Sequence, residues 1–205
     1  MDFTMVLVIV LQIHGNRDRL GENHMNKMNY RIALQSRKML MDGLIKLMET
    51  YEFSMITVTQ ICQEAGLSRR TFYRLYNTRE DILNEYMSTL AEEFFCMVAD
   101  KAPHHYTEVA VIYFEFWKQH EIFLNLLKKN KMLELIYRIS GEIAPVVFQD
   151  VKPDMKLDDM TLSYLLSYSL GGLNGLLIRW VDEGMKLSSE QIKTILEGAL
   201  QIAVI

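Results

Sequence analysis

The segment of residues 69–76 carries the side chains whose types and spacing most clearly suggest a chemistry. At helical spacing Phe72 and Leu75 point inward, whereas the basic and aromatic residues share the outward face. Those outward residues are Arg69, Arg70, Tyr73 and Arg74. Guanidinium groups bind phosphates and guanine edges bidentately, and like charges crowded on one short helix repel each other unless a polyanion lies against them. We therefore predict DNA contact; a merely solvated surface is the alternative.

The residues before this segment predict the elements that position it. Residues 32–51 repeat apolar side chains at helical spacing, which indicates an amphipathic helix. Thr57 is suited to cap a short helix over 58–65, Gly66 can end it in a left-handed conformation, and Ser68 can cap the next helix, 69–76. Two short helices joined by a tight turn form a helix-turn-helix, whose second helix enters the major groove.

A third helix is predicted to begin after Thr78, because Asp81 stands three residues on, as in a capping box. Arg79 places a cation at the positive end of that helix dipole, which is unfavourable unless an anion lies nearby. A DNA phosphate would supply the anion; pairing of Arg79 with a neighbouring carboxylate is the alternative. Apolar spacing continues this helix to about Met97, so it would act as a lever for the recognition helix.

These residues together resemble a known family signature. Residues 56–76, followed by 79–83, are similar in order and spacing to the tetracycline-repressor family of transcriptional regulators. The resemblance implies phosphate contacts from Thr71, Tyr73 and Arg79, and base or groove contacts from three arginines. With the two caps, the predicted DNA-binding set is Thr57, Ser68, Arg69, Arg70, Thr71, Tyr73, Arg74 and Arg79. Three positions depart from the usual pattern: Cys62 replaces alanine, Leu75 replaces histidine or tyrosine, and Arg79 replaces lysine.

Charge and composition fit a two-part helical protein. Three prolines, ten glycines and long apolar stretches predict an all-α fold. Residues 30–80 carry eight basic against five acidic side chains, a balance of +3, whereas residues 81–205 carry eleven against eighteen, a balance of -7. We expect a flexible N-terminal extension over 1–29, a DNA-binding domain over 30–80, and an effector-binding and dimerisation domain over 81–205.

The middle of the chain is rich in large apolar residues. Residues 106–119 and 122–140 are predicted as two helices after the break at Pro103. The family resemblance implies a ligand cavity in this region, and the candidate pocket residues are Tyr113, Phe116, Trp117 and Phe123. Ordinary core packing is the alternative. Residues 113–130 and 171–184 also resemble family members related to regulators of dihydroxyacetone kinase genes, some of which bind a protein partner instead of a small molecule.

The uncharged residues 160–178 favour a subunit interface. Small side chains spaced by four form a stripe on which another helix can approach closely. These candidate interface residues are Ser163, Ser167, Gly171 and Gly175. We expect a homodimer in which the helices over 158–181 and 188–203 pair with their copies, and hence a palindromic operator on double-stranded DNA. A membrane span over 160–178 is the alternative, disfavoured by its serines and Asn174.

Other functional classes find little support in the sequence. His104 and His105 are adjacent and lack companions at metal-ligand spacing, and no catalytic or cofactor-binding motif appears, so we expect no metal, no cofactor and no enzyme. Cys62 and Cys96 sit in apolar helical patterns, which suits buried reduced thiols and a cytoplasmic location. The predicted function is a repressor released from its operator by an unidentified small-molecule or protein effector. The alternative is a coregulator whose C-terminal domain docks another regulator.

Overall fold

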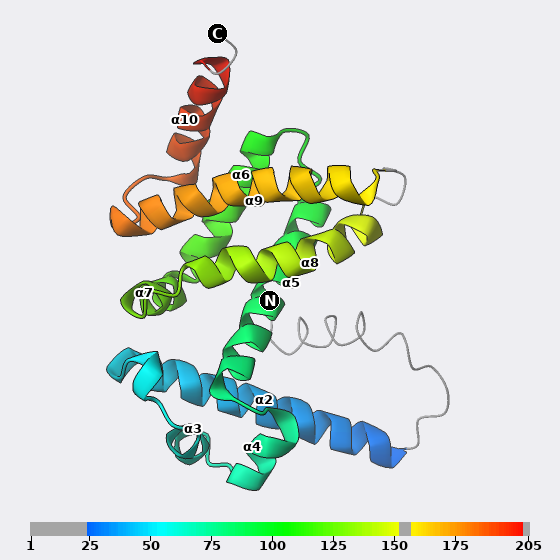
Figure 1. Cartoon of the computed structure of the whole chain (residues 1–205), viewed down its shortest axis with the longest axis vertical. Helices are drawn as coiled ribbons and strands as arrows, with labels where there is room; N and C mark the ends of the chain where they lie inside the picture. The colour runs from blue at the N-terminus through cyan, green and yellow to red at the C-terminus, as the bar shows by residue number, and fades with distance from the viewer. Residues whose placement is uncertain (1–23, 152–156, 203–205) are drawn as a thin grey trace. The chain divides into compact units, whose positions relative to one another are not determined.

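A computed structural model describes residues 24–151 and 157–202 of the chain, and within these ranges every regular element is a helix (Figure 1). The predicted all-α fold is therefore confirmed. The chain divides into two compact units, one up to Thr89 and one from Leu90. This boundary lies inside helix α5 (Arg79–Lys101), further along the chain than the expected boundary between Glu80 and Asp81.

The first unit holds a three-helix head and the beginning of α5. Its elements are α2 (His24–Thr50), η1 (Phe53–Met55), α3 (Val58–Glu64) and α4 (Arg69–Leu75). Helix α2 begins at His24, so the last part of the expected flexible extension, residues 24–29, is helical instead. The remainder of that extension, residues 1–23, lies outside the described residues.

Apolar side chains from three helices form the core of the first unit. On α2, Leu40, Leu44 and Met48 recur every fourth residue and are almost completely buried, as are Ile61 on α3 and Phe72 on α4. Helix α3 approaches α2 closely at one point. A Cβ atom at Gly43 would lie 3.3 Å from the backbone nitrogen of Ala65 and 3.4 Å from the carbonyl oxygen of Ile61, so a larger residue there would push the helices apart.

The second unit contains the remainder of α5 and five further helices in the described ranges. These are α6 (Tyr106–Gln119), α7 (Glu121–Lys129), α8 (Glu134–Val151), α9 (Asp159–Asp182) and α10 (Ser189–Ile202). Helix α9 packs along α8, and α10 packs along α6. In the described part of the chain, no helix has the length and apolar character that crossing a membrane requires, and α9, which includes residues 160–178, is among those helices.

The prediction of one helix over residues 122–140 is wrong, because the chain turns between α7 and α8. The Asn130 side chain donates to the Leu126 carbonyl (2.8 Å), and the Met132 amide donates to the Leu127 carbonyl (2.8 Å). Between them Lys131 adopts a left-handed conformation with φ of 56°. These bonds satisfy the last carbonyl groups of α7 as in a common helix C-cap, but with a lysine in the position that usually holds glycine.

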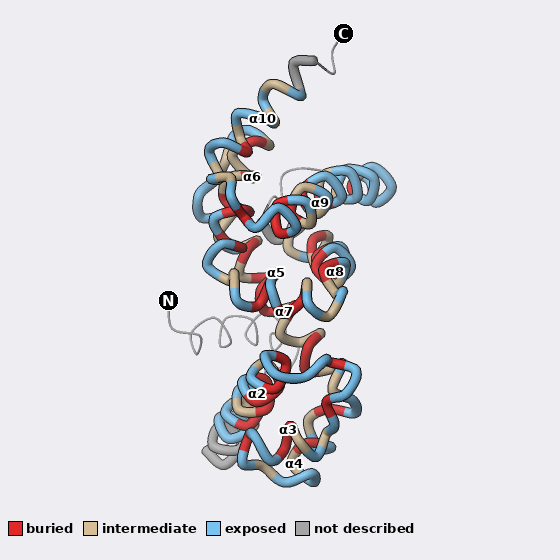
Figure 2. Tube along the Cα trace, turned by 90° about the vertical axis from the view of Figure 1, so that its left-hand side faces the viewer, coloured by how far each residue is buried: buried red, intermediate tan, exposed pale blue. Residues whose placement is uncertain are grey.

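Aromatic rings dominate the core of the second unit. Phe94 of α5 lies 5.2 Å from Tyr113 and 5.8 Å from Phe116, measured between ring centroids. Phe114, on the other side of α6, meets Trp180 of α9 at 5.2 Å in an edge-to-face arrangement. Figure 2 shows the buried positions of these helices in red. Such ring contacts are worth about 0.5–1.5 kcal/mol each beyond the area they bury.

Candidate nucleic-acid interface

Side-chain caps set where the two short helices begin. The Thr57 hydroxyl accepts from the Gln60 amide (3.3 Å), and the Gln60 side chain accepts from the Thr57 amide (2.9 Å), which completes a capping box. The Ser68 hydroxyl accepts from the Thr71 amide (3.1 Å) at the start of α4. Both predicted caps are confirmed. Both hydroxyl groups are thus engaged by backbone amides of the protein itself, and they fix the residues at which α3 and α4 begin.

Gly66 makes the turn between α3 and α4. Its φ of +65° is left-handed, as predicted, and a Cβ atom built there would touch nothing within 4 Å. The Leu67 amide then donates to the Cys62 carbonyl (2.9 Å), which closes the end of α3. The chain therefore reverses within a few residues and presents α4 directly after α3, as a helix-turn-helix requires.

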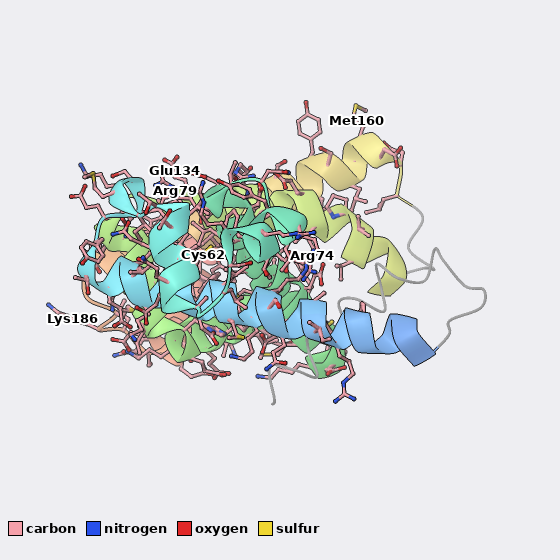
Figure 3. All side chains as sticks on the ribbon, turned by 90° about the horizontal axis from the view of Figure 1, so that it is seen from below. Cys62, Arg74, Arg79, Glu134, Met160 and Lys186 are labelled. Carbon is pink, nitrogen blue, oxygen red and sulfur yellow. The ribbon has the colours of Figure 1, made fainter. Side chains whose placement is uncertain are left out.

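Helix α4 divides into a buried and an exposed side. Phe72 is fully buried, whereas Arg69 and Arg70 are exposed. Arg74, which is labelled in Figure 3, is exposed as well. Tyr73 is 51% exposed and stands with its ring edge-to-face against Phe72. Thr71 and Leu75 are half-buried, and α4 ends at Leu75, one residue before the predicted end. The structure thus brings the four predicted outward residues together on one surface.

The arginines of this surface have no acidic partner in the chain as described. None of the three forms an ion pair with another described residue. The Arg69 guanidinium lies 5.8 Å from the centre of the Tyr73 ring. By contrast, Glu64 at the end of neighbouring α3 is already paired with Lys46. The exposed surface of α4 is therefore a concentration of uncompensated positive charge, which suits a polyanionic ligand.

Arg79 is placed differently from the other predicted DNA-binding residues. Its Nη1 donates to the main-chain carbonyls of Ser54 (3.0 Å) and Ile56, and its Nε donates to Glu80 (3.0 Å). The guanidinium also lies 5.0 Å from the centre of the Phe53 ring, and three-quarters of the side chain is buried. The local carboxylate considered as the alternative partner is thus present, together with two backbone acceptors that sequence reasoning missed.

A second contact, partly buried, anchors the end of α4. Arg37 of α2 forms an ion pair with Glu85 of α5, and its guanidinium lies 5.1 Å from the centre of the Tyr76 ring. Tyr76 follows the last residue of α4 and is 6% exposed, and this burial raises the pKa of its hydroxyl above the ordinary value. The network joins α2, α4 and α5. Sequence analysis missed it, since nothing local links residues 48 positions apart.

The candidate effector-pocket residues are all buried in the aromatic core. Tyr113, Phe116, Trp117 and Phe123 are each less than 5% exposed. Two hollows in this unit, of about 330 and 580 Å³, are lined by other residues, with Phe114, Trp180 and Leu187 common to both. None of the four candidates lines either hollow. Among the described residues, no group of three or more His, Cys, Asp or Glu is placed to hold a metal ion.

The candidate interface residues lie on an uncovered face of α9. Ser163, Ser167, Gly171 and Gly175 are all exposed in the single chain. Beside them stand large exposed apolar side chains, with Met160 at 70%, Tyr164 at 75% and Tyr168 at 74%. Cys96 corrects an expectation: it is exposed, not buried, although it lies in a helix, whereas Cys62 is buried as predicted.

Comparison with known proteins supplies the family. Residues 104–201 match the model of a transcriptional regulator C-terminal region of the tetracycline-repressor type. No curated protein matches the chain significantly. The match covers the second unit, whereas the resemblance noted in the sequence lies in the first, so two separate parts of the chain point to the same group of proteins. The chain belongs to the tetracycline-repressor (TetR) type of transcriptional regulators.

Proposed function

We propose that the protein binds DNA sequence-specifically, with α4 in the major groove. The observation that carries this proposal is the exposed surface of Arg69, Arg70, Tyr73 and Arg74, whose three guanidinium groups have no acidic partner in the described chain. Capping at Ser68 and burial of Phe72 hold that surface on a rigid helix. Arginine forks there can read guanine edges while the tyrosine hydroxyl and Thr71 bind phosphates.

The protein acts, on this proposal, as a homodimer on a palindromic operator. The exposed face of α9 supports this step, because three large apolar side chains and a stripe of small ones lie uncovered together. Contiguous apolar surface of this kind is typical of subunit contacts. A two-fold axis would place two copies of α4 in successive major grooves, about 34 Å apart.

We further propose that the regulator is a repressor released by an effector that binds the second unit. Helix α5 supports this step, since it begins in the first unit and continues through the unit boundary to Phe94, which lies in the aromatic core of the second unit. A change in the second unit that displaced α5 would be carried to the head along one continuous helix.

The experiment is selection of duplexes from a random library by the purified protein, followed by affinity measurements at several salt concentrations. We expect an enriched palindrome. Arg70→Ala should weaken binding by about 1–3 kcal/mol and, if it contacts phosphate, lower the slope of log K against log salt by about 0.9. Arg138→Ala is the matched control, because Arg138 is an exposed arginine of α8 whose loss changes net charge equally. Equal effects of the two variants would contradict a role specific to α4.

The dimer is tested by sedimentation of Gly175→Arg. A Cβ atom at Gly175 meets nothing within 4 Å in the single chain, so the protomer should fold while the partner helix is excluded. Gly141→Arg is the control, since Gly141 of α8 has equally open surroundings.

If no duplex is enriched by a folded dimer, the alternative of a coregulator that docks another regulator takes the place of independent DNA binding.

A further inference from the structure

The start of α5 is tied to the turn before the helix-turn-helix by a single side chain, that of Arg79. From the first residue of α5 it reaches the carbonyl groups of Ser54 and Ile56, at positions 25 and 23 residues earlier in the chain. Ile56 is fully buried and immediately precedes Thr57, the residue that caps α3. One guanidinium thus joins the residues that start α3 to those that start α5.

Three of the five donor hydrogens of this guanidinium are used inside the protein. Both hydrogens of Nη1 serve the two carbonyl groups, and that of Nε serves Glu80. The ring of Phe53, itself 8% exposed, covers one face of the group. Only Nη2 remains for an external ligand. The three arginines of α4 differ in this respect, because they are exposed and form no ion pair within the described chain.

The electrostatics agree with an internal role. A cation in the first turn of a helix is unfavourable, but here Glu80 and Asp81 stand in the same turn, and two carbonyl oxygens accept from the guanidinium. Arginine suits this position better than lysine, because its planar fork reaches several acceptors at once. The acceptors that compensate the Arg79 cation are therefore provided by the protein itself, as in the alternative of a neighbouring carboxylate.

We infer that Arg79 is a positioning residue for DNA recognition rather than a phosphate contact: it holds the 53–57 turn against α5 and thereby sets the placement of α3 and α4. This inference rests on the proposed DNA binding. It replaces the phosphate contact that the family resemblance implied for Arg79, and it predicts that charge alone will not substitute for arginine at this position.

The test compares Arg79→Lys, Arg79→Gln and Arg70→Ala on the selected operator, over a series of salt concentrations. If Arg79 positions the turn, Arg79→Lys and Arg79→Gln both lose affinity, by roughly tenfold for the charged hydrogen bonds removed, while the slope of log K against log salt stays at the wild-type value. Arg70→Ala is the comparison at a residue proposed to contact DNA directly: it should lose affinity and, if the contact is to phosphate, lower the slope by about 0.9. Full affinity in Arg79→Lys, with a slope reduced by about 0.9 in Arg79→Gln, would overturn the inference.

A second measurement does not depend on DNA. Amide hydrogen exchange of the full-length protein should be faster in residues 53–57 and the first turn of α3 in Arg79→Gln than in wild type, and unchanged there in Arg70→Ala. Unchanged exchange in Arg79→Gln would also overturn the inference. If wild-type protein binds no operator but exchange accelerates as expected, the positioning contact stands and the proposed DNA-binding function fails, so the two failures are distinguishable.

Discussion

Removing either member of the ion pair between Arg37 and Glu85 should destabilise the first unit, and removing both should cost less than the two single changes added together. The pair joins α2 to α5 beside Tyr76, which follows the last residue of α4. The perturbation is Arg37→Gln, Glu85→Gln and the double variant. Both changes remove charge and keep some hydrogen-bonding capacity, and Glu85→Gln also keeps the side-chain length.

The expected size follows from how far the pair is exposed. The Arg37 and Glu85 side chains are 30% and 34% exposed, so the pair lies between a surface ion pair, worth about 0.2–1 kcal/mol, and a buried one, whose breaking costs about 3–5 kcal/mol. We expect a coupling energy of about 1 kcal/mol. Arg37→Gln should cost about 0.5–1 kcal/mol more than Glu85→Gln, because it also removes the cation from the Tyr76 ring.

The assay is urea unfolding of the four proteins at low and high salt, read as a double-mutant cycle. A matched control cycle uses Lys38 and Asp42, an exposed pair on α2 whose side chains are 45% and 57% exposed. That cycle should give about 0.3–0.5 kcal/mol at low salt and less at high salt, whereas the half-buried pair should keep more of its coupling energy. A coupling energy for Arg37 and Glu85 no larger than the control would refute the reasoning.

Two further predictions concern local structure in the head. Gly66→Ala should lower the free energy of unfolding by about 1–2 kcal/mol, because the left-handed φ of +65° is unfavourable for alanine and the new methyl group meets nothing within 4 Å. Gly66→Asn should cost less in the same urea titration, because asparagine tolerates that conformation. Equal losses in the two variants would argue against a conformational cause. The Asp81 carboxylate accepts from the amides of Thr78 and Asn77, hydrogen bonds that lower its pKa below the ordinary value. The stability that this carboxylate contributes is therefore present above the ordinary carboxyl pKa and is lost as pH falls through the lowered pKa. The free energy of unfolding of wild type should drop more steeply below about pH 4 than that of Asp81→Asn. Parallel pH profiles of the two proteins would contradict this assignment.

Where a feature depends on neighbours within one turn of the chain, it could be predicted from the sequence. Thr57 and Ser68 cap their helices, Gly66 turns the chain, and Phe72 faces inward as helical spacing required. Helix caps and helical periodicity depend on residues at most four positions apart, so both can be predicted from the sequence. The end of α7 is the exception. No glycine or proline marks it, and Lys131 takes the left-handed position that glycine usually holds.

Features that depend on residues from distant parts of the chain could not be predicted without the fold. The sequence offered Arg79 a DNA phosphate or a neighbouring carboxylate as its partner, but only the fold placed the carbonyl groups of Ser54 and Ile56 beside it. Arg37 likewise gains its partners Glu85 and Tyr76 only through the fold, since both lie far from it in the sequence. An all-α chain with an arginine-rich surface on α4 could be predicted from the sequence, because those properties are local. The sequence did not determine which arginines remain free for a ligand, because that depends on what each side chain meets across the fold.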